Sequence, residues 1–400
     1  MPRAQPLLEL PSGAQGVLPS QYLKRAIEAG VIHAGSEPIP DENLQPASLD
    51  LRLGEVAYSL RCSFLPDVHT VEEKLKKNIF DELDLRGESR LLETQRPYLI
   101  PLKERVALPY NIRGRTNPKS STGRLDVFTR VITDYSHQFD EVAPGYSGQL
   151  YLEVVPLSFA IRVREDLALN QLRLSVGRTE LSDDEIRARH DKDPLLFREG
   201  EPVPTDRLEL ADFRMPVANG MFLSLDLRGD RNGRIGYRAR DNAPFLDMCR
   251  PHPVEPEPYW EDVKREEGNR VVLAPQKFYL LMSYEAVSIP PDLASEMTAF
   301  DPTAGELRTH YAGFFDPGFG YDRRGRFNGS RAALEVRAHD VPFLIEHGQP
   351  VCKLTFERMM EEPATLYGED LGSNYQRQEE TLGKHFLRTQ APTQPGEFPG

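Results

Sequence analysis

The sequence QPASLDLRLG, from Gln45 to Gly54, returns as MFLSLDLRGD from Met221 to Asp230, which places Ser48 and Ser224 176 residues apart. Both copies alternate apolar and polar residues, the pattern of a β-strand with one buried face. Three further echoes follow in the same order: RVALP (105–109) with AVSIP (286–290), VAPGYSG (142–148) with FDPGFGY (315–321), and YLEVVP (151–156) with ALEVRA (333–338). Four echoes in one order, each about 180 residues apart, indicate a tandem duplication of a whole domain.

Within each half the signals are those of short strands separated by Pro-Gly and Gly-rich turns. The segment AHDVPFLIEHGQPVCKLTFE predicts two strands around a turn at His347 and Gly348. Long helical spacing is scarce. Its clearest cases are SQYLKRAIEA (20–29), where Ser20 is the expected N-cap, and the charged SDDEIRARH around Ser182. The sequence therefore predicts an all-β fold of two tandem domains with a few short helices.

The expected boundaries follow from the repeat and from the charged, proline-bearing stretch between its copies. We expect a flexible N-terminus over 1–17, a first domain over 18–179, a linker over 180–205, a second domain over 206–378 and a flexible tail over 379–400.

The chain carries 49 basic and 62 acidic residues, a formal charge of -13 at pH 7. That balance argues against a nucleic-acid partner, although a local cluster of cations can still bind a small phosphorylated ligand. Cys62, Cys249 and Cys352 are odd in number and far apart, which favours neither a disulfide framework nor a CxxC metal site. The N-terminus lacks the apolar core of a signal peptide, and no apolar stretch of about 18 residues occurs, so we expect a cytoplasmic protein without membrane contact.

The densest polar cluster is NPKSSTGRLD (117–126). Lys119, Ser120, Ser121 and Arg124 place two cations and two hydroxyls beside a glycine, and these are the groups that bind a polyphosphate. A solvated serine-rich loop explains the same residues without a ligand. The P-loop pattern is absent, so phosphate binding here requires a different cradle.

A second candidate is Glu153 in QLYLEVVP. A carboxylate flanked by Leu152 and Val154 either faces solvent by strand alternation or lies desolvated in a site, where its pKa rises. A third is LYGEDLGSNYQRQ (366–378), which is either a flexible lid or an ordinary polar tail. Zinc nucleobase deaminases carry H-x-E with a later P-C-x-x-C, and no such pair occurs, so we expect no zinc and no metal ligands.

Together the cluster, the glutamate and the tail resemble the dCTP deaminases of the dUTPase-like superfamily, in their long duplicated bacterial form, over residues 18–378. KSSTGR is similar to the family's R-S-S-x-x-R nucleotide loop, APGYSG to its D-P-G-[WY]-x-G turn, YLEV to the strand with its catalytic glutamate, and YGEDLGSNYQRQ to the tail motif Y-G-x-K-Y-Q-x-Q that closes over the nucleotide. The resemblance implies two tandem dUTPase-like domains, each a β-clip or distorted β-barrel.

Carried over residue by residue, the resemblance implies that Glu153 is the catalytic glutamate and that Ser120 and Arg124 are its active-site partners. The nucleotide-binding positions that it implies are Lys119, Ser121, Tyr151, Leu152, Tyr367, Asn374 and Gln378. Two positions depart from the family pattern. Ala143 replaces the turn aspartate that contacts the sugar, for which Asp140 or Glu141 could substitute, and Asn374 replaces a tail lysine on the phosphate side.

The halves differ in complementary ways. The second half keeps Arg308 and Glu335 but has Thr303 and Ala304 in place of the serine pair, and the tail motif exists only there. We therefore expect one functional site per chain, with loop and glutamate from the first half and a lid from the second half of the same or another subunit. Family members are trimers, so the resemblance also implies a homo-oligomer with sites at domain or subunit interfaces.

The implied reaction is hydrolytic deamination of dCTP to dUTP and ammonia, metal-independent at the base. Glu153 would act as general acid and base, Ser120 and a backbone carbonyl would hold the water, and Arg124 would orient the carboxylate. Mg²⁺ would accompany the triphosphate. The nearest alternative is a dUTP diphosphatase or a bifunctional deaminase and diphosphatase, and the alternative of another class is a non-catalytic nucleotide-binding or sensing protein.

Overall fold

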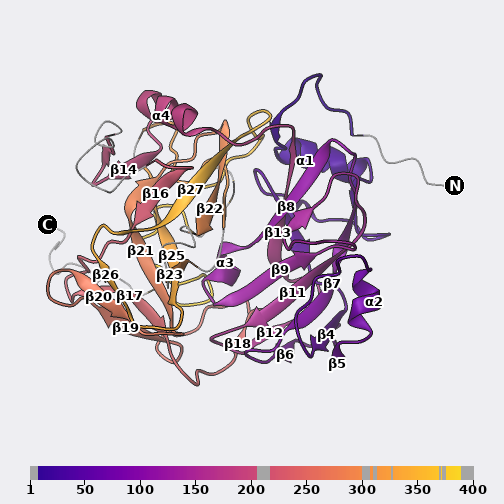
Figure 1. Ribbon diagram of the computed structural model, residues 1–400, viewed down its shortest axis with the longest axis horizontal. Coiled ribbons are helices and arrows are strands. Elements are labelled where there is room, and N and C mark those ends of the chain that lie inside the picture. The colour runs from indigo at the N-terminus through magenta and orange to yellow at the C-terminus, as the bar shows by residue number, and fades with distance from the viewer. Residues whose placement is uncertain are drawn as a thin grey trace, which may run out of the picture.

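A computed structural model describes residues 8–204, 217–299, 307–309, 313–325, 328–368, 371 and 375–388. Strands dominate, and the two halves of the chain form two lobes that lie side by side (Figure 1). The helices are short: α1 (Ser20–Glu28), α2 (Val71–Leu75), α3 (Ser120–Gly123), α4 (Asp183–Lys192) and a 3-10 turn over Asp41–Asn43. The predicted all-β class with few short helices is confirmed.

The first lobe is built from two sheets. One has the order β1 (Gly16–Val17), β13 (Ala168–Val176), β8 (Ile112–Pro118), β10 (Glu141–Val142), with β3 (Leu49–Arg52) also on β13. The other has the order β5 (Ile79–Asp84), β4 (Val56–Leu60), β7 (Tyr98–Ala107), β11 (Ser147–Pro156), β9 (Val127–Ile132), with β2 (Ile32–His33) on β7. Apolar side chains from both sheets, such as Leu172 and Leu152, share one hydrophobic core.

The second lobe repeats this plan. One sheet has the order β15 (Glu201–Pro202), β14 (Leu196–Arg198), β21 (Phe278–Val287), β17 (Arg234–Ala239), β19 (Trp260–Lys264), and β25 (Ser330–Ala338) pairs with β21 and with β23 (Leu307–Thr309). The other has the order β16 (Met221–Ser224), β27 (Pro350–Arg358), β22 (Leu293–Ala299), β24 (Phe314–Phe315). The predicted strand pair around His347 and Gly348 is present as β26 (Phe343–Glu346) and β27, and β26 also pairs with β20 (Arg270–Leu273).

The duplication is visible in matching backbone contacts. Glu153 on β11 lies opposite Leu99 on β7, and Glu335 on β25 lies opposite Leu280 on β21. The two Pro-Gly turns are also held alike. The Tyr146 carbonyl accepts a backbone hydrogen bond from Leu108 and the Phe319 carbonyl accepts one from Ile289, both at 2.8 Å, and these donors lie just after β7 and β21. The echoes at YLEV and at the turn therefore mark equivalent positions.

The first echo, by contrast, is out of register. Buried Glu104 accepts a hydrogen bond from the backbone N–H of Arg52 at 2.6 Å, and buried Glu285 accepts one from the backbone N–H of Ser224 at 2.7 Å. Ser224 is thus equivalent to Arg52 rather than to Ser48. Side chains in a strand alternate between its two faces, so shifting the alignment of the two copies by four residues leaves the buried positions buried. The sequence pattern alone therefore cannot reveal the shift.

The stretch expected as a linker is packed against the second lobe. Its helix α4 is capped by Ser182, whose hydroxyl accepts from the Glu185 N–H in a capping box. Ile186, Leu196 and Val203 join the second hydrophobic core. The cap expected at Ser20 does not form. Helix α1 begins at Ser20 itself, one residue earlier than expected, so Pro19 occupies the N-cap position and provides no side-chain hydrogen bond.

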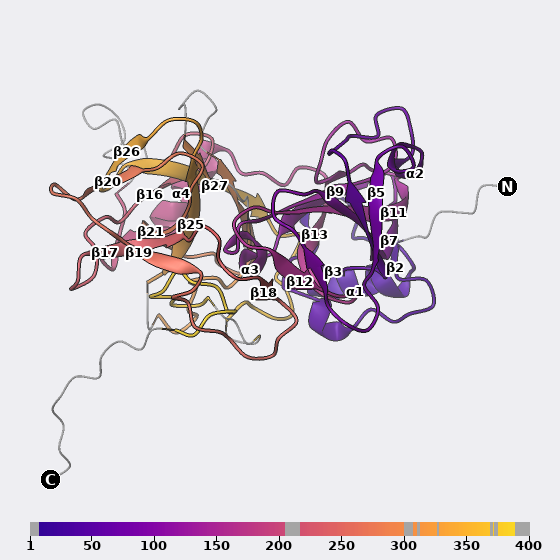
Figure 2. The same ribbon diagram turned by 90° about the horizontal axis from the view of Figure 1, so that it is seen from below.

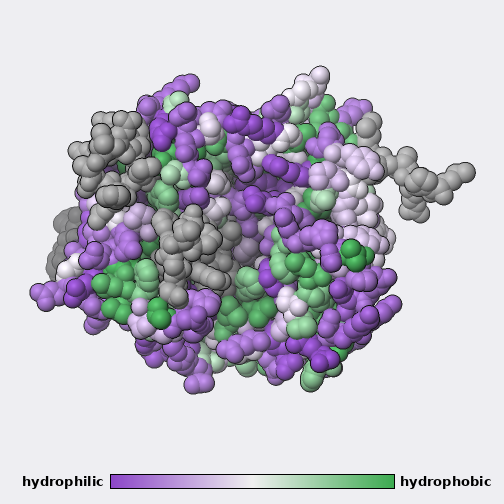
Figure 3. Space-filling model, viewed as in Figure 1, coloured by the Kyte–Doolittle hydropathy of each residue, from purple (hydrophilic) through white to green (hydrophobic). Residues whose placement is uncertain are grey.

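The lobes are also joined directly. The short strand β18 (Leu246–Asp247) of the second half pairs in parallel with β12 (Ile161–Val163) of the first (Figure 2). Strand β6 (Arg90–Leu92) pairs with β12 on its other side and completes this small sheet (Figure 1). The face shown in Figure 3 is mainly hydrophilic, with scattered apolar patches. Among the described residues, no helix has the length and apolar character that crossing a membrane requires.

Candidate active site

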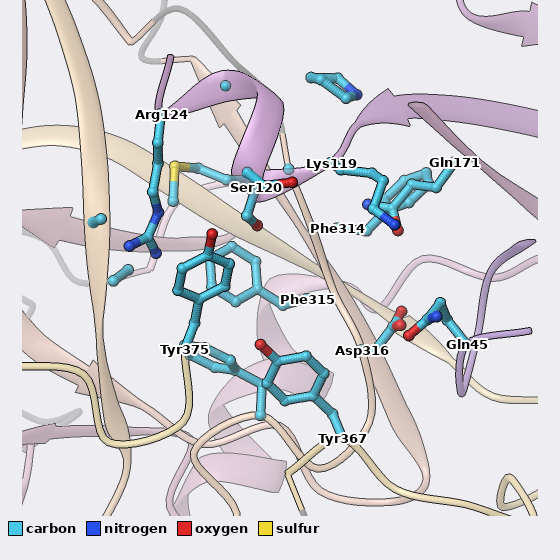
Figure 4. A pocket seen from close by; sticks show the side chains of 18 of the residues that line it. Gln45, Lys119, Ser120, Arg124, Gln171, Phe314, Phe315, Asp316, Tyr367 and Tyr375 are labelled. Atoms are coloured by element: carbon cyan, nitrogen blue, oxygen red, sulfur yellow. The ribbon is translucent and has the colours of Figure 1, made fainter. Parts of the chain in front are cut away.

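A cavity of about 240 Å³ opens between the two halves, beside α3 (Figure 4). Both halves line it: from the first, Gln45, Asp50, Pro118, Lys119, Ser120, Ser121, Gly123, Arg124 and Gln171, and from the second, Met297, Gly313, Phe314, Phe315, Asp316, Phe319, Ala332, Ala333, Glu335, Tyr367, Tyr375, Gln378 and Lys384. The cavity exists because the halves pack together, since neither supplies all of its walls.

The polar loop of the first half forms one wall. Strand β8 ends at Pro118, and the chain then makes the single helical turn α3, with Lys119 as its N-cap residue. Ser120 is exposed to the cavity, whereas Ser121 and Arg124 are buried. The structure thus brings together the four loop residues that the sequence singled out.

The carboxylate that faces this loop is Glu335, from β25 of the second half. A Cβ atom added to Gly123 would lie 2.6 Å from Glu335 Oε2, so only glycine lets the carboxylate approach the loop backbone this closely. Burial raises the pKa of Glu335 to about 8, with Asp126 acting in the same direction and Arg124 opposing it. A carboxyl group with this pKa exchanges protons readily near neutral pH.

Arg124 connects the loop to the C-terminal tail. Its guanidinium donates to Gln378 Oε1 at 2.6 Å and to the Thr381 carbonyl at 3.1 Å, and its Cζ lies 3.9 Å from the centre of the Tyr375 ring. Gln378 in turn donates to the Arg331 carbonyl on β25 at 2.6 Å. The tail is therefore closed over the cavity in this conformation, and Figure 4 shows Arg124 directed toward Tyr375.

The other predicted tail residues divide in two. Tyr367 lines the cavity, and its backbone N–H donates to the Pro317 carbonyl at 2.9 Å, which ties the tail to the Pro-Gly turn of the second half. Asn374 lies outside the described residues.

The same turn places Asp316 in the cavity wall. Asp316 occupies the position that is Ala143 in the first half, so the turn aspartate that the first half lacks is supplied by the second. Arg173, a buried residue of the first half, pairs with Asp316 at 3.3 Å and with Glu357 at 3.0 Å. Burial raises the pKa of Asp316, and Arg173 opposes that rise.

Glu153 is not brought to this cavity. Its carboxylate is buried in the first lobe, where it accepts hydrogen bonds from Ser63 at 2.8 Å and from Arg130 at 3.0 Å. The Arg130 guanidinium also lies 3.7 Å from the ring centre of Phe139. The predicted grouping of Glu153 with Ser120 and Arg124 thus does not form within the chain, because the loop of the first half faces the strand of the second.

The two flanking residues predicted to contact the base lie elsewhere as well. Tyr151 packs in a small hydrophobic cluster with Leu60 and Leu99, and Leu152 is in the core of the first lobe. Ala333 stands at the position equivalent to Tyr151 and lines the cavity. A methyl group at this position leaves open space that a phenol ring would fill.

Sequence reasoning did not select Glu335, Asp316, Asp50 or Lys384 as site residues. The first two carried a usable signal, since Glu335 keeps the catalytic position of the motif and FDPG keeps the aspartate that the first half has lost. Asp50 and Lys384 carried none. Within the described part of the chain, no group of three or more His, Cys, Asp or Glu side chains is placed to hold a metal ion.

Comparison with known proteins assigns a separate family model to each half of the chain. The model for the N-terminal domain of 2'-deoxycytidine 5'-triphosphate deaminase (DCD) matches residues 14–178, and the model for its C-terminal domain matches residues 182–386. The crystal structure of 2'-deoxycytidine 5'-triphosphate deaminase from Agrobacterium tumefaciens is 40% identical, with a TM-score of 0.78, over 88% of this chain and 99% of that one.

Curated relatives match a smaller part of the chain. A dCTP deaminase of Natronomonas pharaonis is 28% identical over 160 residues, 39% of this chain and 78% of the relative. A dUMP-forming dCTP deaminase of Methanothermobacter thermautotrophicus is 25% identical over 138 residues, 34% of this chain and 67% of the relative. Each of these matches spans less than half of this chain.

Proposed function

Because the chain belongs to the 2'-deoxycytidine 5'-triphosphate deaminase family, we propose that it hydrolyses dCTP to dUTP and ammonia in the cavity between its halves. The observation that carries this proposal is the contact of Glu335 with the loop at Gly123, beside Ser120 and Arg124. A proton-transferring carboxylate, a hydroxyl and a guanidinium from different halves meet there in one cavity.

In the proposed reaction, Glu335 replaces Glu153 as the proton shuttle. Its carboxylate takes a proton from water as the water oxygen attacks C4 of cytosine, and then gives that proton to N3. It next takes the hydroxyl proton of the tetrahedral intermediate and passes it to the amino group, which leaves as ammonia while the C4 carbonyl forms. One carboxylate with a pKa of about 8 serves both transfers, and such acid–base catalysis contributes roughly 10²–10⁴-fold.

The surrounding residues take supporting roles in this proposal. The Ser120 hydroxyl, exposed to the cavity, positions the water or the leaving group, and Arg124 favours the ionised form of Glu335. Asp316, which lines the cavity, is the proposed acceptor of a hydrogen bond from the sugar. Lys119 and Ser121 are proposed phosphate contacts, and Tyr367 and Gln378 close the site as parts of the tail.

The remaining parts of the proposal concern the surroundings of the reaction. Mg²⁺ arrives as the complex of the triphosphate, because Mg²⁺ is usually held by substrate phosphates and few protein ligands. We propose a homo-oligomer in the cytoplasm, a compartment that suits the three cysteine thiols, none of which is in a disulfide.

Measurement of both products tests the function. Purified protein is incubated with Mg²⁺ and either dCTP or dUTP, and ammonia and pyrophosphate are assayed separately in each reaction. Ammonia without pyrophosphate is the expected result. Equal amounts of ammonia and pyrophosphate from dCTP would instead establish a dUMP-forming enzyme. Pyrophosphate from dUTP with no ammonia from dCTP would establish a diphosphatase. The absence of both products would indicate a binding protein.

A further inference from the structure

One cation in the cavity wall belongs to none of the motifs: Lys384, six residues beyond Gln378. It lines the same cavity as Lys119 and Asp50, although it comes from the segment that the sequence predicts to be a flexible tail. The cavity wall thus contains two lysines, Lys119 from the loop of the first half and Lys384 from the C-terminal segment.

The segment around Lys384 is held in place on both sides. Leu382 and Phe386 are buried in the hydrophobic core that is mainly built by the first half. Val254 donates to the His385 carbonyl at 2.9 Å and accepts from the Leu387 N–H at 2.8 Å, so the backbone is paired there. Lys384 itself donates its backbone N–H to the Tyr375 hydroxyl at 3.3 Å. These contacts hold the backbone from which the Lys384 side chain reaches the cavity wall.

The charges in this wall are unbalanced. Lys119 forms an ion pair with Asp50, whose side chain is only 8% exposed. Lys384 is near enough to both that Lys119 lowers its pKa and Asp50 raises it, while burial makes the largest contribution and lowers it. The other nearby carboxylate of this wall, Asp316, is paired with Arg173, so the two ammonium groups share Asp50, which leaves a positive charge for an anionic ligand to neutralise.

We propose that Lys384 binds the phosphate chain of the nucleotide together with Lys119 and thereby sets the preference for a triphosphate over a monophosphate. This inference rests on the proposed function, since it takes a deoxycytidine nucleotide as the ligand. It also accounts for the absence of a lysine at Asn374: the positive charge enters the cavity from a later position in the tail.

Binding measurements test the proposal without relying on turnover. The dissociation constants of dCTP and dCMP are measured by titration calorimetry in the Glu335→Gln background, which should bind dCTP without turnover. In that background the wild-type Lys384 is compared with Lys384→Gln, Lys384→Arg and the control Lys76→Gln, which changes an exposed lysine at the end of α2. We expect Lys384→Gln to weaken dCTP binding about tenfold or more, the loss of a charged hydrogen bond, and to weaken dCMP binding much less. Lys384→Arg should restore most of the dCTP affinity, and Lys76→Gln should match the wild type.

Two results would overturn the role of Lys384: unchanged dCTP affinity in Lys384→Gln, or an equal loss for dCTP and dCMP with an unchanged melting temperature. A lower melting temperature of Lys384→Gln would indicate that Lys384 has a structural role. If Lys384→Arg restored the dCTP affinity but not the melting temperature, the loss of affinity could not be explained by that structural role. A wild type that binds dCTP but releases no ammonia would reject the proposed deamination while leaving this binding test intact.

Discussion

Glu153 and Glu335 occupy equivalent positions on equivalent strands, yet their surroundings differ. Glu153 is paired with Arg130 and Ser63 of its own lobe, so its charge is compensated where it lies. Glu335 faces Gly123 and Arg124 across the boundary between the halves, and its pKa is raised to about 8. The same residue type in the same strand is thus an ion-pair partner in one half and, in our proposal, the proton-transfer group in the other.

Exchange of each glutamate for glutamine separates these roles. Glu335→Gln should bind dCTP but lose roughly 10²–10⁴-fold in kcat, because the amide cannot accept the proton of water. Glu153→Gln should retain kcat within a few-fold, since its carboxylate lies outside the cavity. Steady-state ammonia release with both variants checks this, and a large loss of kcat in Glu153→Gln at normal melting temperature would contradict the assignment.

The raised pKa of Glu335 predicts a pH profile. The carboxylate must be ionised to accept the first proton, so kcat/KM should rise with pH and level off above about pH 8. Stability should follow the opposite course. Because the folded pKa exceeds the usual value of 4.5, the folded state binds more protons between these pH values, and stability falls as pH rises through that range.

Melting curves of wild type and Glu335→Gln across pH 5 to pH 9, read as a difference at each pH, isolate the contribution of this one carboxyl group. The difference should grow in favour of the variant as pH rises through the range between about 4.5 and about 8. A difference independent of pH would contradict the raised pKa.

At the scale of elements, the C-terminal segment beyond the tail motif acts as an anchored closure of the cavity. Phe386 lies 5.3 Å from the ring centre of Tyr259 and 5.9 Å from that of Trp260, and Phe159 of the first half packs edge-on against both. Thr381, upstream of this aromatic cluster, accepts the hydrogen bond from Arg124. Aromatic packing away from the cavity therefore holds the tail on the loop that carries Arg124.

Truncation of Phe386 tests this anchoring. Phe386→Ala removes a buried ring that in a core typically contributes about 3–5 kcal/mol, so we expect the segment after Gln378 to detach. The KM for dCTP should rise, and limited proteolysis near residues 381–388 should become faster. The matched control is Leu387→Ala, since the adjacent Leu387 is 41% exposed and should behave as wild type. Equal protease resistance of both variants and the wild type would rule out the anchoring role.

At the scale of the whole molecule, the two copies have divided the work of one site. The first half supplies the loop with Ser120 and Arg124, and the second supplies Asp316, Glu335 and the tail. Ion pairs across the boundary, among them Arg115 with Glu296 at 2.9 Å, hold the halves in this arrangement. Each half thus lacks motif residues that the other half retains: the turn aspartate in the first half and the serine pair in the second.

This division predicts one nucleotide per chain. Titration calorimetry with dCTP and Glu335→Gln, which should bind without turnover, is expected to give a stoichiometry of one. The reciprocal combination, Glu153 with the loop around Thr303 and Ala304, lacks the serine pair. Two equivalent binding events per chain would show that this combination also binds nucleotide.

The sequence by itself determined the duplication, the all-β class, the polar loop and the tail motif. These depend on local order: strand alternation, turn residues and short motifs are properties of neighbouring residues. It also determined that the halves differ, through the missing serine pair and the missing turn aspartate. It left Glu153 and Glu335 as equivalent occupants of one motif position.

Only the tertiary structure decided which glutamate meets the loop, which residue of the first echo matches which, and what the last described residues do. The partners involved lie far apart in the chain: Gly123 meets Glu335, Arg173 meets Asp316, and Arg124 meets Gln378. Such contacts arise from the packing of two lobes, which no local spacing encodes. The physical reason is twofold. The alternation of a strand is unchanged when its alignment shifts by an even number of residues, and the pKa of a buried carboxylate depends on the charges packed around it.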